Sequence, residues 1–225
     1  MRTLALSALV LVAACTDPAG DTVTCKVVDG DILPAIASGP RATRYVPLVT
    51  GATWTYRFTA TLETTTQTVT VMAPEAIDGV MQFPVLTEKA YGVKTTTWLE
   101  DRGQQVVRHR ELSIDGDGDQ FGDETWEPGR PLIDENAAHL DAGSSYTTHF
   151  KDTVIDTGGT YQDCKTDQFE VVSTDDTVTV PAGTFQALKL SRTDNGSTIW
   201  YARGVGRVKQ TGATSTYELL DFAIP

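Results

Sequence analysis

The stretch 113–124 of the chain, SIDGDGDQFGDE, has the residue types and spacing that point most directly to chemistry. Asp115, Asp117 and Asp119 alternate with two glycines, and Asp123 follows four positions later. Carboxylates at alternate positions offer the hard oxygen ligands that Ca²⁺ prefers, and glycines allow a short loop to wrap around an ion. The alternative is a solvated acidic turn whose carboxylates stay hydrated and repel one another. We expect calcium in a structural role, bound with the low affinity typical of extracellular modules.

The spacing of these aspartates resembles that of thrombospondin type 3 repeats and other EF-hand-like calcium repeats. Two positions depart from the EF-hand pattern: Gln120 stands where glycine is usual, and Trp126 stands where a bidentate glutamate is usual. No flanking helices are indicated, so we expect a lone calcium loop over 113–127 that clamps an excursion between two strands. The implied ligands are Asp115, Asp117, Asp119, the Phe121 carbonyl, Asp123 and, at the last position, Glu127 or Glu124.

An export signal is predicted over residues 1–14. Arg2 precedes an apolar run from Leu4 to Ala14, which is too short to span a bilayer as a helix and is typical of a secretory signal. Small residues stand directly before Cys15, and this pattern resembles the bacterial lipobox, in which the cysteine is diacylated after cleavage. A plain secretory signal or an uncleaved anchor is the alternative. Because Thr16 rather than aspartate follows the cysteine, we expect Cys15 to anchor the protein in the outer membrane, facing the periplasm or the cell surface.

Length and charge bound the domain organisation and the partners. Removal of 14 residues from 225 leaves 211, a usual size for one all-β domain. The formal charge of −12 becomes −13 without Arg2, which argues against nucleic acid and anionic membrane surfaces as partners because both repel an acidic protein. Residues 15–43 show no sustained period, so we expect a flexible tether to a single β domain over 44–225. The oligomeric state is not indicated.

The three cysteines support an extracytoplasmic location. With Cys15 assigned to lipid, Cys25 and Cys164 remain as an even pair in an exported chain, where disulfides persist. We favour a bridge between them over two free thiols, because it ties the leader to the domain. Metal binding by two isolated cysteines without a neighbouring histidine is not expected.

Alternation of apolar and polar residues predicts antiparallel strands. In TWTYRFTATL, residues 53–62, Trp54, Tyr56 and Phe58 alternate with threonine and arginine, which gives one apolar and one wet face. Similar runs continue to the C-terminus, with hairpin turns predicted at 181–183, 195–196 and 211–213. A short helix is indicated only over 133–140, with Asp134 as its cap. The predicted fold is therefore all-β: a strongly curved antiparallel sheet, either a half-barrel or an open barrel meander, with at most one short helix.

Three segments resemble, in this order, a family of uncharacterised bacterial secreted proteins and lipoproteins with a domain of unknown function: YVPLVTGATWTY, VTVPAGTFQALKL and WYARGVGRVK. The resemblance covers about residues 45–222. It implies a half-barrel like that of periplasmic lipoprotein carriers, with a concave face suited to apolar contact, and it implies no activity. The acidic stretch is not one of the shared motifs, so calcium binding is not implied by this resemblance.

The sequence contains no recognisable catalytic motif. Neither a Gly-x-Ser-x-Gly elbow nor a His-Glu-x-x-His pair occurs. The histidines are His109, His139 and His149, and two of them have a serine nearby in the sequence, Ser113 or Ser144. We therefore expect no enzymatic activity.

The leading interpretation is a membrane-anchored binding or scaffold module with a structural Ca²⁺ loop, whose partner is an apolar ligand or a protein. The alternatives are a carrier that holds a lipid or acyl chain on its concave sheet, and a hydrolase with an unrecognised site. A deep apolar cavity favours the carrier, and a histidine with a serine or aspartate partner in a cleft favours the hydrolase. A filled core with only a bound ion favours the scaffold.

Overall fold

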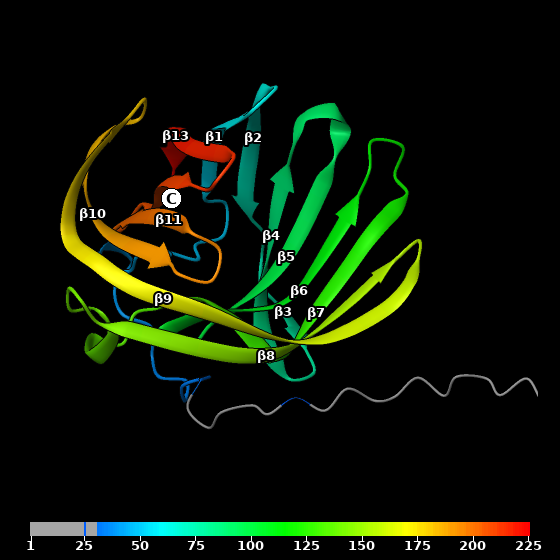
Figure 1. The fold of residues 1–225 in the computed structure, drawn as a ribbon, viewed down its shortest axis with the longest axis horizontal. Coiled ribbons are helices and arrows are strands. Elements are labelled where there is room, and N and C mark those ends of the chain that lie inside the picture. The colour runs from blue at the N-terminus through cyan, green and yellow to red at the C-terminus, as the bar shows by residue number, and fades with distance from the viewer. Residues whose placement is uncertain (1–24, 26–30) are drawn as a thin grey trace, which may run out of the picture.

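The computed structural model describes Cys25 and residues 31–225, and its strands form an antiparallel sheet that closes into a barrel (Figure 1). Around the barrel the strands follow the order β2-β1-β13-β12-β11-β10-β9-β8-β7-β6-β5-β4, and β2 pairs with β4 to complete the ring of twelve. β3 pairs with the beginning of β4. The prediction of an all-β, strongly curved antiparallel sheet is confirmed. The pairing of β2 with β4 closes what the sequence indicates only as a half-barrel or open meander.

The strands are β1 (Thr53–Ala60), β2 (Thr64–Val71), β3 (Glu75–Ile77), β4 (Val80–Glu88), β5 (Lys94–Asp101), β6 (Gln105–Ile114), β7 (Gln120–Asp134), β8 (Ser145–Asp156), β9 (Gly159–Val180), β10 (Gly183–Arg192), β11 (Ser197–Ala202), β12 (Gly206–Thr211) and β13 (Ser215–Ala223). Three short 3-10 helices lie between strands or before them: η1 (Arg41–Thr43), η2 (Ala90–Gly92) and η3 (Ala137–His139). Residues 31–225 contain no α-helix. No helix of the described residues is long and apolar enough to cross a membrane.

The aromatic face predicted for the first strand packs in the barrel core. Trp54 and Tyr56 of β1 are buried, and they alternate with half-buried threonines. Each ring keeps one polar atom bonded, because the Trp54 indole donates to the Val205 carbonyl at 2.5 Å and the Tyr56 hydroxyl donates to the Arg207 carbonyl at 2.8 Å. Large aromatic side chains bury much surface while their polar atoms still require partners. These bonds tie β1 to the β11–β12 hairpin.

The hairpin turns predicted for the C-terminal third are confirmed. Pro181 and Ala182 separate β9 from β10, and Gly183 has a positive φ of 140°. Gly196 turns the chain between β10 and β11 with φ of 69°. Both glycines adopt backbone conformations that cost an L side chain energy, which is why glycine marks these turns in the sequence.

The short helix predicted over 133–140 is a single 3-10 turn, η3. Its cap is Asn136, whose side-chain oxygen accepts the Ala138 amide at 2.9 Å, so the assignment of Asp134 as the cap is wrong. Asp134 ends β7, and its carboxylate instead binds the amide of Gln105 at 3.0 Å and the ring of His139 at 2.8 Å. A sequence pattern alone does not reveal this long-range competition for the carboxylate.

The leader lies against the barrel from residue 31 onward. The Leu33 amide donates to the Gln105 side chain at 2.7 Å, at the end of the barrel where β6 begins. Arg44 is 5% exposed and pairs with Asp101 at 2.8 Å and with Glu135 at 3.1 Å. The described part of the predicted tether, 31–43, is therefore attached to the barrel. The predicted signal over 1–14 and Cys15 lie outside the described residues.

The disulfide predicted between Cys25 and Cys164 is present, with Cα atoms 5.5 Å apart. Cys164 lies on β9, and the neighbouring strand β8 provides a second attachment point. There the Asp31 carboxylate accepts bonds from the backbone amide of His149 at 2.8 Å and from its ring at 2.9 Å. The leader is thus tied to the β8–β9 hairpin by one covalent bond and one polar pair.

Candidate binding site inside the barrel

The acidic stretch forms the tight turn between β6 and β7. Asp115 accepts the backbone amides of Asp117 and Asp119 with one carboxylate oxygen, both at 3.0 Å. The Asp115 amide in turn donates to the Asp119 carbonyl at 2.9 Å. Pairing continues up to this turn, because Ile114 is opposite Gln120. The predicted loop over 113–127 is therefore a turn of residues 115–119 whose backbone is closed by its own hydrogen bonds.

The other predicted calcium ligands belong to β7, and Asp123 and Glu127 among them have ion-pair partners on the neighbouring strands. Asp123 accepts two bonds from Arg110, at 2.8 and 2.7 Å, and Glu127 pairs with Lys151 at 2.5 Å. Phe121 is a strand residue whose side chain is 45% exposed. The described residues contain no group of three or more His, Cys, Asp or Glu side chains arranged to hold a metal ion. The predicted ligands are therefore not gathered around one point in the described residues, and calcium binding stays a prediction.

The three histidines are each paired with a carboxylate. The pairs are His109 with Glu100 at 2.9 Å, His139 with Asp134 at 2.8 Å, and His149 with Asp31 at 2.9 Å. Within the described residues no hydrogen bond joins a serine or threonine hydroxyl to any of these rings, and the Ser113 hydroxyl is bonded to Thr95 at 3.2 Å. The nucleophile–base contact required by a serine hydrolase is not formed among them.

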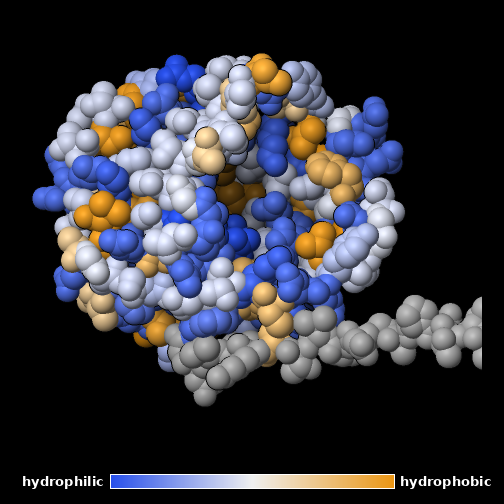
Figure 2. All heavy atoms as spheres, viewed as in Figure 1, coloured by the Kyte–Doolittle hydropathy of each residue, from blue (hydrophilic) through white to orange (hydrophobic). Residues whose placement is uncertain are grey.

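A cavity of about 200 Å³ lies inside the barrel. The space-filling view shows this face of the molecule hollowed near its centre, with hydrophobic atoms at the floor of the hollow (Figure 2). Its aliphatic wall consists of Val46, Leu48, Val69, Val71, Val85, Leu99 and Leu132. Alternation explains the wall: Val69 and Val71 are two positions apart on β2, and Val71 is paired with Val85 of β4. Residues 46–48, which precede β1, contribute to the same lining.

Three charged side chains line this cavity, and two of them have polar partners. Glu111 accepts a hydrogen bond from the Thr97 hydroxyl at 2.9 Å. Arg207 donates to the Gln210 side chain at 2.7 Å, and its guanidinium lies over two tyrosine rings. The third is Arg108. With two cations and one anion, the lining is positive although the whole chain is strongly acidic.

Arg108 differs from every other arginine of the described residues, because its side chain forms no hydrogen bond or ion pair in this part of the chain. Its Nε atom is buried without a partner. The guanidinium carbon lies 5.4 Å from the centroid of the Trp126 ring, over its face. Burial, and then the like charge of Arg130, lower the pKa of Arg108 to about 10. The guanidinium thus remains charged at neutral pH in an unfavourable environment.

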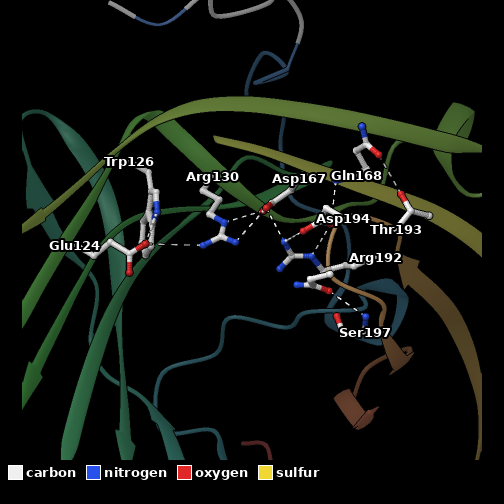
Figure 3. Close-up of polar contacts among 10 residues, drawn as sticks. Glu124, Trp126, Arg130, Asp167, Gln168, Arg192, Thr193, Asp194 and Ser197 are labelled. Atoms are coloured by element: carbon white, nitrogen blue, oxygen red, sulfur yellow. Dashed lines mark hydrogen bonds and ion pairs between the residues drawn. The ribbon is translucent and has the colours of Figure 1, made fainter. Parts of the chain in front are cut away.

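A second cavity, of about 270 Å³, contrasts with the first because its charges are paired. Asp167 is 3% exposed and bridges Arg130 at 2.7 Å and Arg192 at 2.6 Å, and Arg192 also pairs with Asp194 at 2.6 Å (Figure 3). Its lining has three cationic and three anionic side chains. We therefore assign this polar row a structural role.

Glu124, next to this row, is a titrating group near neutrality. Burial, and then the neighbouring Asp152 carboxylate, raise the pKa of Glu124 to about 7. The Trp126 indole donates to it at 3.0 Å, and Arg130 lies 4.0 Å away. One oxygen of Asp152 is buried without a partner. A neighbouring carboxylate disfavours the charged form, so Glu124 keeps its proton to a higher pH than an isolated carboxyl group would.

The sequence does not single out Arg108. It lies in VVRHREL, where simple alternation sets neighbouring residues on opposite faces. The pairing of β6 with β7 shifts register between Val106 and Val107 and again between Arg108 and Arg110. Such bulges re-aim side chains relative to strict alternation. The only signal in the sequence is the presence of several arginines in one short strand.

Comparisons with known proteins show a similar fold and no established function. No protein-family model and no curated protein sequence matches the chain. A crystal structure of a candidate lipoprotein from Parabacteroides distasonis ATCC 8503 matches with a TM-score of 0.52 and 14% identity, over 80% of this chain and 99% of that one. An exported-protein candidate with a YmcC-like fold from Bacteroides fragilis NCTC 9343 matches with a TM-score of 0.48 and 14% identity, over 79% of this chain and 98% of that one.

Proposed function

We propose that this chain is an exported lipoprotein of the cell envelope that binds a small apolar molecule inside its barrel. The lipobox-like pattern around Cys15 supports export and lipid anchoring. The similarity of the fold to that of a candidate lipoprotein, with a TM-score of 0.52, also supports this location. In this proposal the protein holds its ligand and does not transform it.

The apolar cavity is the observation that carries the proposal. Seven aliphatic side chains line it, from strands β2, β4, β5 and β7 and from the segment 46–48 before β1. Protein interiors are otherwise packed to the density of organic crystals, and small-molecule sites are typically concave and apolar with a few polar groups. A ligand that buries about 200 Å² of apolar surface gains about 5 kcal/mol from the hydrophobic effect. The carrier alternative is therefore favoured over a scaffold with a filled core.

Binding of N-phenyl-1-naphthylamine, a neutral apolar fluorophore, tests the proposal. The full-length chain with Cys15→Ser is used, because it lacks the acylated thiol. Val69→Trp places an indole in the cavity, and Thr70→Trp places the same ring at the adjacent position, on the opposite face of β2. We expect saturable fluorescence enhancement with the parent chain and with Thr70→Trp, and its loss with Val69→Trp. Absence of binding by the parent chain, or equal binding by both variants, contradicts the proposal.

A further inference from the structure

Arg108 is a charged side chain in the wall of the cavity that has no hydrogen-bond or ion-pair partner among the described residues. Every other arginine within residues 31–225 donates at least one hydrogen bond, and several of the buried ones pair with carboxylates, as Arg44 does with Asp101. Burial of a guanidinium nitrogen without a partner is costly, because that nitrogen loses its hydration and no protein acceptor replaces it. The Nε–H donor of the rigid guanidinium fork is therefore buried beside an apolar cavity with no acceptor among the described residues, and its terminal nitrogens form no hydrogen bond to them either.

The other two charged side chains of the lining do not pair with Arg108. Glu111 lies beyond ion-pair distance of Arg108, and its carboxylate is bonded to Thr97 at 2.9 Å. Arg207 adds a second positive charge to the same lining. The neighbouring polar cavity has as many anionic as cationic side chains, whereas the lining of the apolar cavity has an excess of positive charge.

The arrangement of Arg108 relative to the apolar wall defines the shape of a complementary ligand. Arg108 is the cross-strand neighbour of Leu99, which belongs to the aliphatic wall. The Trp126 ring lies against the guanidinium, with its centroid 5.4 Å from the guanidinium carbon, and offers it no hydrogen-bond acceptor. A molecule that fills the apolar part of the cavity and ends at Arg108 must therefore be apolar along its length and anionic at one end.

We infer that the ligand is a single-chain amphiphile with one oxyanion head, a carboxylate or a phosphate, and that Arg108 binds this head. This inference rests on the proposed function and names the class of ligand for the same cavity. Guanidinium matches both oxyanions in a bidentate geometry, and such charge-assisted bonds are stronger than neutral ones. The head supplies the partner that Arg108 lacks, so an anionic amphiphile should bind more tightly than a neutral amphiphile of equal chain length.

Calorimetric titration with octanoate, octyl phosphate and octanol tests the inference in the full-length Cys15→Ser chain. The variants are Arg108→Met, Arg108→Lys and, as a matched control, Arg110→Met. Arg110 lies on the same strand and carries the same charge, but it pairs with Asp123 and does not line the cavity. The control therefore reproduces the change in net charge without altering the lining.

We expect the parent chain and Arg110→Met to bind at least one of the anions about tenfold more tightly than octanol, the ratio that corresponds to one charged hydrogen bond. Arg108→Met should bind anion and alcohol equally, and Arg108→Lys should retain part of the difference. The preferred anion identifies the head as carboxylate or phosphate.

Two results overturn the inference in distinguishable ways. Equal binding of anions and octanol by the parent chain refutes the role of Arg108 and leaves the proposed function intact. Binding of none of the three probes refutes both. Thermal unfolding gives a second measurement that also reports whether the variants fold: octanoate or octyl phosphate should raise the midpoint of the parent chain and not that of Arg108→Met, while octanol should affect both equally.

Discussion

Replacement of Arg108 by methionine should stabilise the protein in the absence of ligand. The substitution removes a charge that has no acceptor among the described residues and retains an unbranched apolar side chain beside the cavity. A residue kept for ligand binding commonly costs stability in the free protein. A residue kept for structure does the reverse, so the sign of the change separates the two roles.

The magnitude follows from the environment of the guanidinium. Burial, followed by the charge of Arg130, lowers the pKa of Arg108 from 12.5 to about 10, which corresponds to about 3 kcal/mol of lost charge stabilisation at 1.36 kcal/mol for each tenfold change in proton affinity. The penalty is fully present below pH 10, because the group is charged in both the folded and the unfolded chain there. The lost contact with the Trp126 ring offsets about 1–2 kcal/mol. A net gain of about 1–2 kcal/mol is expected at pH 7.

Thermal unfolding at pH 7 is the assay. For a domain of this size, 1 kcal/mol shifts the midpoint by about 2–4 °C, so Arg108→Met should unfold about 2–8 °C above the parent chain. Arg130→Met is the control, because Arg130 is paired with the buried Asp167 and its loss should lower the midpoint. If Arg108→Met unfolds at a lower temperature than the parent chain, the guanidinium is a satisfied structural group and the reasoning is refuted.

Three further outcomes are expected. Asp167→Asn removes the charge that bridges two arginines, and the free energy of unfolding in urea should fall by about 3–5 kcal/mol; a loss below about 1 kcal/mol contradicts the bridging role. Burial, and then Asp152, raise the pKa of Glu124 from 4.5 to about 7, so the folded chain retains a proton that the unfolded chain releases, and the free energy of unfolding falls as the pH rises through this interval. Urea titrations of Glu124→Gln should lack this fall, and an unchanged slope counts against the assignment. Calcium binding by the 115–119 turn, which stays a prediction, should give a higher unfolding midpoint in calcium than in chelator for the parent chain and no difference for Asp117→Asn; equal midpoints for the parent chain contradict the predicted site.

The fold class was predictable because its signals are local. Alternation in 53–62 indicates a strand with an apolar face, and Gly183 and Gly196 mark turns at which a positive φ is required. The pairing of Cys25 with Cys164 was predictable for a different reason, since an even number of cysteines in an exported chain leaves few combinations. None of these inferences requires knowledge of how distant strands pack.

The acidic stretch shows where a local signal is ambiguous. Alternating aspartate and glycine is compatible both with a calcium loop and with a tight turn in which Asp115 binds the loop amides. Which is formed depends on the strands on either side, and their pairing continues to Ile114 and Gln120. The partner of Asp123 is Arg110, on the opposite strand. The sequence alone does not specify these cross-strand partners.

An antiparallel β fold, its principal turns and its disulfide are predictable from the chain alone, because side-chain alternation and glycine conformation act over short distances and the cysteines can simply be counted. The pairing of β2 with β4 that closes the barrel, and the apolar cavity inside it, become evident in the three-dimensional structure. It also shows that bulges in β6 leave Arg108 at this cavity without a partner among the described residues. Closure and the pairing of charges depend on contacts between residues far apart in the chain, so they arise only once the whole sheet has formed.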